Sequence, residues 1–145
     1  MKKMGKYPEC FPENFEEEIL PKEAKEENKN VYRVIKSGKI DRNSFIGTFE
    51  EIKRGLIPKK KRINMNDPGL YSTSCNIDYS EAEYVLDLFI RHHPQPKIAK
   101  GVTHERCGPC QLTSEREQRK DTHVDCWIYE KSKPQLYFKE VADNE

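Results

Sequence analysis

A turn, a short strand and the start of a helix are packed into residues 67–83, and this run limits the fold more than any other part of the chain. Residues 67–69 read Asp-Pro-Gly, which is a turn by composition. Residues 70–75 follow as a strand with clustered hydroxyl side chains, and either Asp78 or Ser80 can cap the next helix. Hydroxyl groups at a strand end beside a helix N-terminus often hold anionic ligands in α+β enzymes.

The rest of the chain alternates strand patterns with helix patterns. Apolar residues recur at three-and-four spacing in residues 45–52 and again in residues 82–90, as amphipathic helices require. We therefore predict an α+β domain with a small, largely antiparallel sheet and two main helices. The predicted order is a strand at 31–35, a helix at 41–54, a strand at 70–75, a helix from 80 to about 93 and a strand at 97–102. A polar segment at 103–122, either a long loop or a short helix, and a terminal hairpin of strands 124–129 and 136–141 follow.

The chain is predicted to divide into a charged, partly ordered N-terminal arm, residues 1–29, and a single α+β domain, residues 30–145. Hydrophobic residues make up 34% of the chain and charged residues 35%, so the core must be modest. Aromatic residues, at 10%, supply much of the area that it can bury. The apolar side chains available to anchor the arm are Phe11, Phe15, Ile19 and Leu20.

The charge balance disfavours two classes of partner. With 26 basic and 25 acidic residues the net charge is +1, which produces no overall field to attract nucleic acid or a membrane. The basic loop at residues 59–62 has no interleaved aromatic residues, so a solvated loop is favoured over a nucleic-acid contact. No stretch is long and apolar enough to cross a bilayer, and the basic N-terminus lacks the apolar segment of a signal peptide.

The cysteine count points to a reducing compartment. Five cysteines is an odd number, and no secretion signal accompanies them. Free thiols or a metal site are therefore favoured over disulfides, and a cytoplasmic location is expected.

Arg33 and the hydroxyl strand are the first candidates for a binding site. Arg33 stands in the middle of an otherwise apolar strand, where an arginine needs an anionic partner, either a ligand phosphate or a protein carboxylate. Because side chains alternate along a strand, Ser72 and Ser74 share one face, and Tyr71 and Thr73 share the other. The serine face either lines a pocket or only satisfies backbone groups.

At these residues the chain resembles the ADP-ribosyltransferase superfamily, and within it the RES-domain branch of toxins that consume NAD. The resemblance rests on residues 31–34 (Val-Tyr-Arg-Val), on residues 69–74 (Gly-Leu-Tyr-Ser-Thr-Ser) and on the helix start at Ala82 and Glu83. It implies an ADP-ribosyltransferase-like fold. It also implies an enzyme that takes NAD as its substrate and either cleaves the nicotinamide–ribose bond or transfers ADP-ribose.

The same resemblance implies roles for individual side chains. Arg33 would hold the pyrophosphate, and Glu83 would be the catalytic acid, although a glutamate in the first turn of a helix also serves to cap it. The family's Glu-X-Glu motif is replaced by residues 123–125, so that either Asp125 takes the place of the missing glutamate or transferase activity is absent. Tyr71, Ser72 and Ser74 would line the nicotinamide pocket, with Tyr71 also a catalytic residue, and Thr73 of the same strand would contact the dinucleotide.

A second candidate site is made of cysteines and a histidine. The paired spacing of Cys107, Cys110, His123 and Cys126 is typical of a structural zinc site. Against this, His123 and Cys126 are three apart on a predicted strand and would face opposite ways. The alternative is a set of ordinary thiols. Residues 107–110 also read Cys-Gly-Pro-Cys, as in thioredoxins, but no apolar helix follows them, so a turn is favoured over a redox site.

Two other functions compete with an NAD-consuming, toxin-type enzyme that would have a protein target or an antidote protein as partner. One is a non-catalytic interaction or regulatory protein, whose acidic residues 13–27 would contact a basic partner. The other is a binding module stabilised by zinc.

Overall fold

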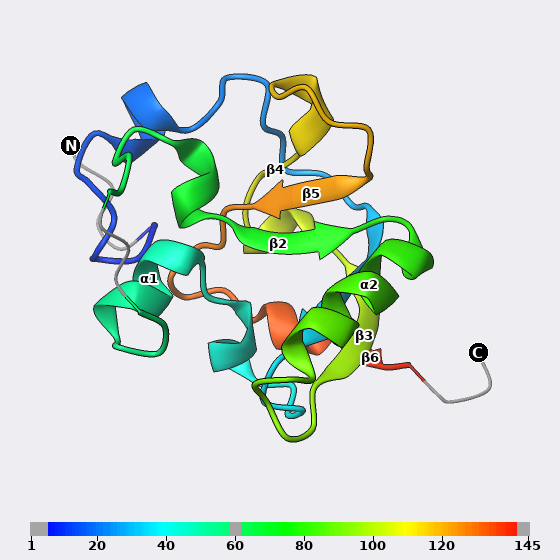
Figure 1. Cartoon of the computed structure of the whole chain (residues 1–145). Helices are drawn as coiled ribbons and strands as arrows, with labels where there is room; N and C mark the ends of the chain where they lie inside the picture. The colour runs from blue at the N-terminus through cyan, green and yellow to red at the C-terminus, as the bar shows by residue number, and fades with distance from the viewer. Residues whose placement is uncertain (1–5, 59–61, 142–145) are drawn as a thin grey trace.

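The computed structural model describes residues 6–58 and 62–141, so three lysines of the predicted basic loop lie outside the described part. It is an α+β structure built on one six-stranded antiparallel sheet (Figure 1). The strands lie in the order β4-β5-β2-β1-β3-β6. Their bounds are β1 Asn30–Ile35, β2 Thr73–Asn76, β3 Lys97–Val102, β4 Cys110–Leu112, β5 His123–Cys126 and β6 Phe138–Glu140.

The sheet is almost divided in two between its central strands. β1 pairs with β3 along its whole length, from Asn30 opposite Val102 to Ile35 opposite Lys97. Its register with β2 consists of one pair, Tyr32 opposite Asn76. β2 turns instead to β5, with which it pairs along its four residues. The strands β1 and β2 therefore diverge beyond Tyr32, which leaves backbone groups there to be satisfied by side chains.

The helix α2, Tyr79–Phe89, confirms the prediction for this part of the chain. The Asp78 side chain accepts a hydrogen bond from the Ser80 amide and caps the helix, as expected from its sequence. In the first turn, the carboxylate of Glu81 accepts a hydrogen bond from the Thr122 amide. Ala82 on the apolar face is buried between Val34 of β1 and Ile98 of β3, so α2 covers this half of the sheet.

The prediction of a single helix at residues 41–54 is wrong for the middle of this segment. The chain forms a 3₁₀ turn at Arg42–Phe45 and then a short helix α1, Thr48–Lys53. Between them the backbone of Gly47 runs against the carbonyl of Tyr71, where a β-carbon would overlap that oxygen. Only a glycine leaves room for this close approach. The backbone of Gly47 is extended, with a ψ of 172°, and this conformation interrupts the helix.

The strand predicted at residues 70–75 is only half formed. Its first part is a 3₁₀ turn, Pro68–Tyr71, because the Asp67 side chain accepts a hydrogen bond from the Gly69 amide and Pro68 opens the turn. The strand itself starts at Thr73.

The predicted terminal hairpin is also wrong. β5 lies in the middle of one half of the sheet, between β2 and β4, whereas β6 is the edge strand beside β3 (Figure 1). β5 is mostly buried and fits an interior position, and the predicted loop at residues 103–122 contributes β4 to its other edge. Phe138 of β6 packs over Gly101, where a side chain on β3 would overlap its ring. Although β5 and β6 are consecutive in sequence, they do not pair with each other, because packing in the tertiary structure places them in different halves of the sheet.

The N-terminal residues 6–29 lie against the sheet and contribute to its core. Phe11, Phe15 and Ile19 are buried in one cluster with Tyr71 and Trp127. A π-helical turn, Phe15–Ile19, presents two of these side chains inward. The residues expected to anchor this segment are the ones that pack. Among the described residues, no helix has the length and apolarity needed to cross a membrane.

Candidate functional site

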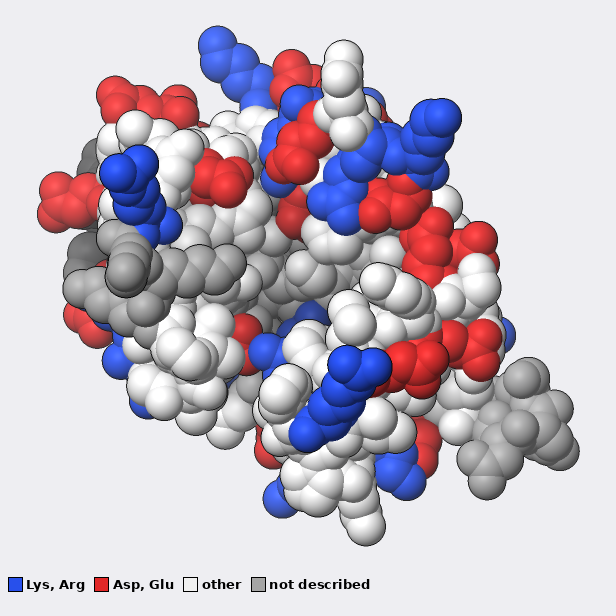
Figure 2. All heavy atoms as spheres, viewed as in Figure 1, with Lys and Arg blue, Asp and Glu red and all other residues white. Residues whose placement is uncertain are grey.

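A cleft of about 240 Å³ opens where β1 and β2 diverge. β1 and β2 form its floor, α1 closes one side and α2 the other. Figure 2 shows this face of the molecule hollowed between these segments, with both basic and acidic side chains near the margin. The polar side chains that line it include Arg33, Lys36, Glu51, Ser72, Ser74 and His123.

Arg33 bridges the split in the sheet. Its Nη1 donates to the carbonyl oxygen of Ser74 on β2 at 2.6 Å, and its Nε donates to the carbonyl of Ser44 at 2.9 Å. The guanidinium also lies 5.6 Å from the centre of the Phe45 ring. No carboxylate among the described residues lies within ion-pair distance of Arg33. The anionic partner expected for this arginine is therefore not a protein carboxylate in this part of the chain, and the remaining donors of the guanidinium are available to a ligand.

An ion pair joins the other charged side chains of the cleft. Lys36 at the end of β1 lies 3.0 Å from a carboxylate oxygen of Glu51 on α1. Its ammonium group is 4.9 Å from the centre of the Phe89 ring, which α2 contributes to the opposite wall. The side chain of Glu51 is 15% exposed. The cleft thus combines two cations, one carboxylate and an aromatic wall.

Ser72 and Ser74 both face this cleft, as their alternation along the strand predicted. The Ser72 hydroxyl donates to Oδ1 of Asp125 at 2.5 Å, so it presents only acceptor lone pairs to a ligand. The Ser74 carbonyl is occupied by Arg33, and Ser74 itself is exposed.

Asp125 lies beneath the cleft and is buried, with 2% of its surface exposed. Besides Ser72, its carboxylate accepts a hydrogen bond from the Thr113 hydroxyl at 2.7 Å and forms an ion pair with Arg116 at 2.6 Å. Arg116 is fixed in turn by a hydrogen bond to Gln111. Asp125 therefore reaches the cleft through the side chain of Ser72.

His123 was predicted only as a metal ligand, but its side chain lines the cleft. Its Nδ1 lies 2.5 Å from the hydroxyl of Thr113. Burial lowers the pKa of His123 below its ordinary value, and the nearby Asp125 carboxylate only partly opposes this. The imidazole is consequently neutral at pH 7.

Tyr71 and Thr73 lie away from the cleft, which corrects their predicted role in lining it. The Tyr71 ring is buried among Phe11, Phe15 and Phe49, and its hydroxyl donates to the carbonyl of Met65. Thr73 is buried on the same face and borders a different, much smaller cavity. Both face inward because the opposite face of the strand carries the serines.

Glu83 also lies outside the cleft. It is exposed on the first turns of α2, and the carboxylate that lines the cleft is that of Glu51. Sequence reasoning missed Glu51, because a glutamate beside Glu50 in a short helix carries no local sign of which way it points. Phe89 and Lys36 were missed for the same reason.

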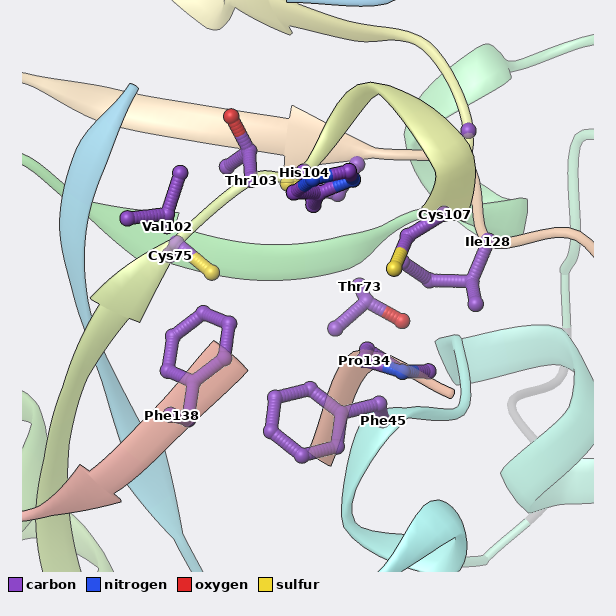
Figure 3. A pocket seen from close by; sticks show the side chains of 12 residues that line it. Phe45, Thr73, Cys75, Val102, Thr103, His104, Cys107, Ile128, Pro134 and Phe138 are labelled. Atoms are coloured by element: carbon purple, nitrogen blue, oxygen red, sulfur yellow. The ribbon is translucent and has the colours of Figure 1, made fainter. Parts of the chain in front are cut away.

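Four of the five cysteines, all except Cys10, gather on the inner face of the sheet. Cys75, Cys107 and Cys126 border a small cavity of about 20 Å³, and Figure 3 shows the sulfur atoms of Cys75 and Cys107 turned into this space. Burial raises the pKa of Cys107 and Cys110, and contact with Cys75 together with burial raises the pKa of Cys126. These three thiols are therefore protonated at neutral pH, and protonated buried thiols are poor nucleophiles.

The sequence-predicted zinc ligands do not meet at one point. His123 opens onto the cleft, whereas Cys107 and Cys126 border the small cavity on the inner face. Within residues 6–58 and 62–141, no three His, Cys, Asp or Glu side chains are arranged to hold a metal ion. Cys107 and Cys110 flank a turn in which Gly108 has a φ of +134°, in line with the favoured interpretation of the Cys-Gly-Pro-Cys run.

Comparison with protein-family models, with curated proteins and with solved structures finds no match to this chain.

Proposed function

We propose that the cleft between α1, α2, β1 and β2 binds NAD and that the protein cleaves its nicotinamide–ribose bond, on an α+β fold of the ADP-ribosyltransferase-like kind. The volume of the cleft, about 240 Å³, suits part of a dinucleotide, with the remainder lying along the open face. ADP-ribosyl transfer to a protein would use the same cleft and the same bond cleavage.

The observation that carries this proposal is the unpaired charge of Arg33. Its guanidinium lines the cleft and binds only backbone carbonyls among the described residues. A half-buried arginine with unused donors is suited to an anion, and its planar fork matches a phosphate group well. The ammonium of Lys36 lines the same cleft, where it is paired with the carboxylate of Glu51.

Glu51 is the residue we propose for the catalytic carboxylate, in place of Glu83. Cleavage of the nicotinamide–ribose bond develops positive charge on the sugar, and a nearby carboxylate stabilises that charge. Glu51 lines the cleft, where it is held by Lys36. Asp125 is less suited to direct contact, because Ser72 and Thr113 occupy its oxygens.

Calorimetric titration of the full chain with NAD tests the proposal. Arg33→Lys is expected to raise the Kd for NAD at least about tenfold, because charged hydrogen bonds to phosphate are lost. Arg42→Lys is the matched control, since Arg42 also donates to two backbone carbonyls, those of Phe45 and Tyr129, but lies outside the cleft. Its Kd should equal that of the wild type.

Release of nicotinamide is the second measurement. Glu51→Gln is expected to bind NAD with nearly unchanged affinity and to release nicotinamide at least about 100-fold more slowly, because it loses the charge that stabilises the transition state. A wild-type chain that neither binds NAD in the calorimeter nor releases nicotinamide contradicts the proposal. Equal affinities of the Arg33 and Arg42 variants contradict the placement of the phosphates.

A further inference from the structure

A chain of three side chains leads from the buried ion pair of Asp125 to the cleft. Asp125 Oδ2 accepts the hydrogen bond from Thr113 at 2.7 Å, and the same hydroxyl oxygen lies 2.5 Å from His123 Nδ1. Thr113 is 1% exposed and Asp125 is 2% exposed, so no solvent competes for these bonds. The chain ends at the imidazole of His123, which lines the cleft.

The positions of the protons follow from this geometry. A carboxylate paired with Arg116 has no hydrogen to donate, so the hydrogen between Asp125 and Thr113 belongs to Thr113. A hydroxyl has one hydrogen, and that of Thr113 is therefore used. The short contact between Thr113 and His123 then requires that Nδ1 carries a hydrogen and donates it to the hydroxyl oxygen.

The tautomer of His123 decides whether its imidazole donates a hydrogen bond to a ligand in the cleft or accepts one. When Nδ1 of a neutral imidazole carries the hydrogen, Nε2 carries a lone pair and accepts hydrogen bonds. Nδ1 is turned to Thr113, so Nε2 is the nitrogen left for the cleft. The hydroxyl of Ser72 likewise offers only lone pairs there, because Asp125 takes its hydrogen. This end of the cleft is therefore built to receive a group that donates hydrogen bonds, such as a water molecule.

We propose that His123 is the general base of the reaction, accepting through Nε2 a proton from the attacking water, with Thr113 and Asp125 as positioning residues that fix its tautomer. The proposal rests on the function proposed above and commits it to hydrolysis, with water as the nucleophile. Of His123, Thr113 and Asp125, only His123 is a catalytic residue, because its imidazole alone touches the attacking water.

The step balances without any further reactant. The water oxygen forms a bond to the anomeric carbon of the ribose as the bond from that carbon to the nicotinamide nitrogen breaks. The electron pair of the broken bond stays on nicotinamide and neutralises its ring. The proton of the water moves to His123 Nε2, and the imidazolium keeps its Nδ1 hydrogen bond to Thr113 until the proton passes to solvent.

The surroundings of His123 suit a base that works near neutral pH. Burial keeps the free imidazole neutral, and Asp125 stabilises the imidazolium that forms during the reaction. The other charged groups that act on His123 are Asp121, which favours the imidazolium, and Arg116 and Arg119, which oppose it. Arg33 and Glu51 also line this cleft.

Long-range proton–nitrogen NMR spectra of the full-length wild-type chain test the tautomer directly. The signals of His123 are assigned by their loss in His123→Gln. The expected result is the tautomer with hydrogen on Nδ1, and conversion to the other tautomer in Thr113→Val, which has the shape of threonine but no oxygen. Thr113→Ser should restore the Nδ1 tautomer. Hydrogen on Nε2 in the wild type would overturn the proposal, whatever the activity.

Nicotinamide release then tests the role in catalysis. His123→Gln is expected to lower kcat by at least about 100-fold with little change in the Kd for NAD, and Thr113→Val to lower it by less. His104→Gln is the control, because His104 stacks on Tyr137 and lies outside the cleft. If NAD is cleaved and His123→Gln leaves kcat unchanged, the general base is another group while the proposed function stands. If the wild type does not cleave NAD, both fail together, even with hydrogen on Nδ1.

Discussion

The hydroxyl of Ser72, the residue just before β2, donates to the Asp125 carboxylate on β5 at 2.5 Å, across 53 residues of sequence. Ser74 is the direct partner of Asp125 in the register of β2 and β5, so Ser72 reaches it diagonally on the same face. This one contact connects the cleft floor to the buried group of Asp125, Thr113 and Arg116.

Loss of the Asp125 charge should destabilise the fold strongly. Asp125→Asn removes the shorter of the two ion pairs of Arg116, which is 2.6 Å long against 3.6 Å to Glu117, and we expect the free energy of unfolding to fall by about 3 kcal/mol in urea titrations. Ser72→Ala should lower it by about 1 kcal/mol, and the double variant by less than the sum, because the two groups share one bond. Asp121→Asn is the control: its pair with Arg119 is half-exposed, and the expected loss is below about 1 kcal/mol. Equal losses at the two aspartates would refute this account.

The N-terminal segment should contribute to stability through its aromatic residues. Phe15 is 2% exposed and contacts the rings of Phe11 and Tyr71, so Phe15→Ala should lower the free energy of unfolding by about 3 kcal/mol or more. Tyr84→Ala, at a ring that is 67% exposed on α2, should change it by less than about 0.5 kcal/mol. Thermal and urea unfolding followed by Trp127 fluorescence measures both. An unaffected Phe15→Ala variant would mean that residues 6–29 fold independently of the sheet.

Two glycines with positive φ offer a matched comparison. Gly108 has a φ of +134°, and a β-carbon there would overlap the carbonyl oxygen of Trp127. Gly55 has a φ of +74° but no atom within 4 Å of such a β-carbon. Gly108→Ala should therefore destabilise the protein by at least about 3 kcal/mol, and Gly55→Ala by about 1 kcal/mol, as measured by urea unfolding. Equal effects would show that backbone strain alone matters at both sites.

Stability should decrease as the pH falls through the titration range of His123. Burial lowers the pKa of this group in the folded protein below 6.5, its ordinary value and the value expected in the unfolded chain. The unfolded state then binds more protons between those two pKa values, so acid favours unfolding there. His123→Gln should weaken this dependence as the pH falls below 6.5, whereas His92→Gln, at an exposed position, should leave it intact. The prediction would be contradicted if the free energy of unfolding depended on pH in the same way in His123→Gln and His92→Gln.

Local sequence predicts much of the fold where one short segment decides the outcome. β3 forms at Lys97–Val102 as expected, and α2 starts at the predicted cap Asp78. Alternation along β2 also separates correctly the serines of the cleft from Tyr71 and Thr73. These features depend on hydrogen bonds and side-chain directions within a few residues, which the sequence specifies directly.

The tertiary structure alone decides how those pieces meet. In the tertiary structure β5 lies between β2 and β4, and β6 lies at the opposite edge of the sheet, beside β3. The burial of β5 between two strands outweighs the proximity of β5 and β6 in sequence. The tertiary structure also brings Glu51 and His123 to the cleft and leaves Glu83 in solvent. A carboxylate or an imidazole carries no local sign of its future neighbours. Its surroundings are set by contacts between elements distant in the chain, which depend on the packing of the whole core.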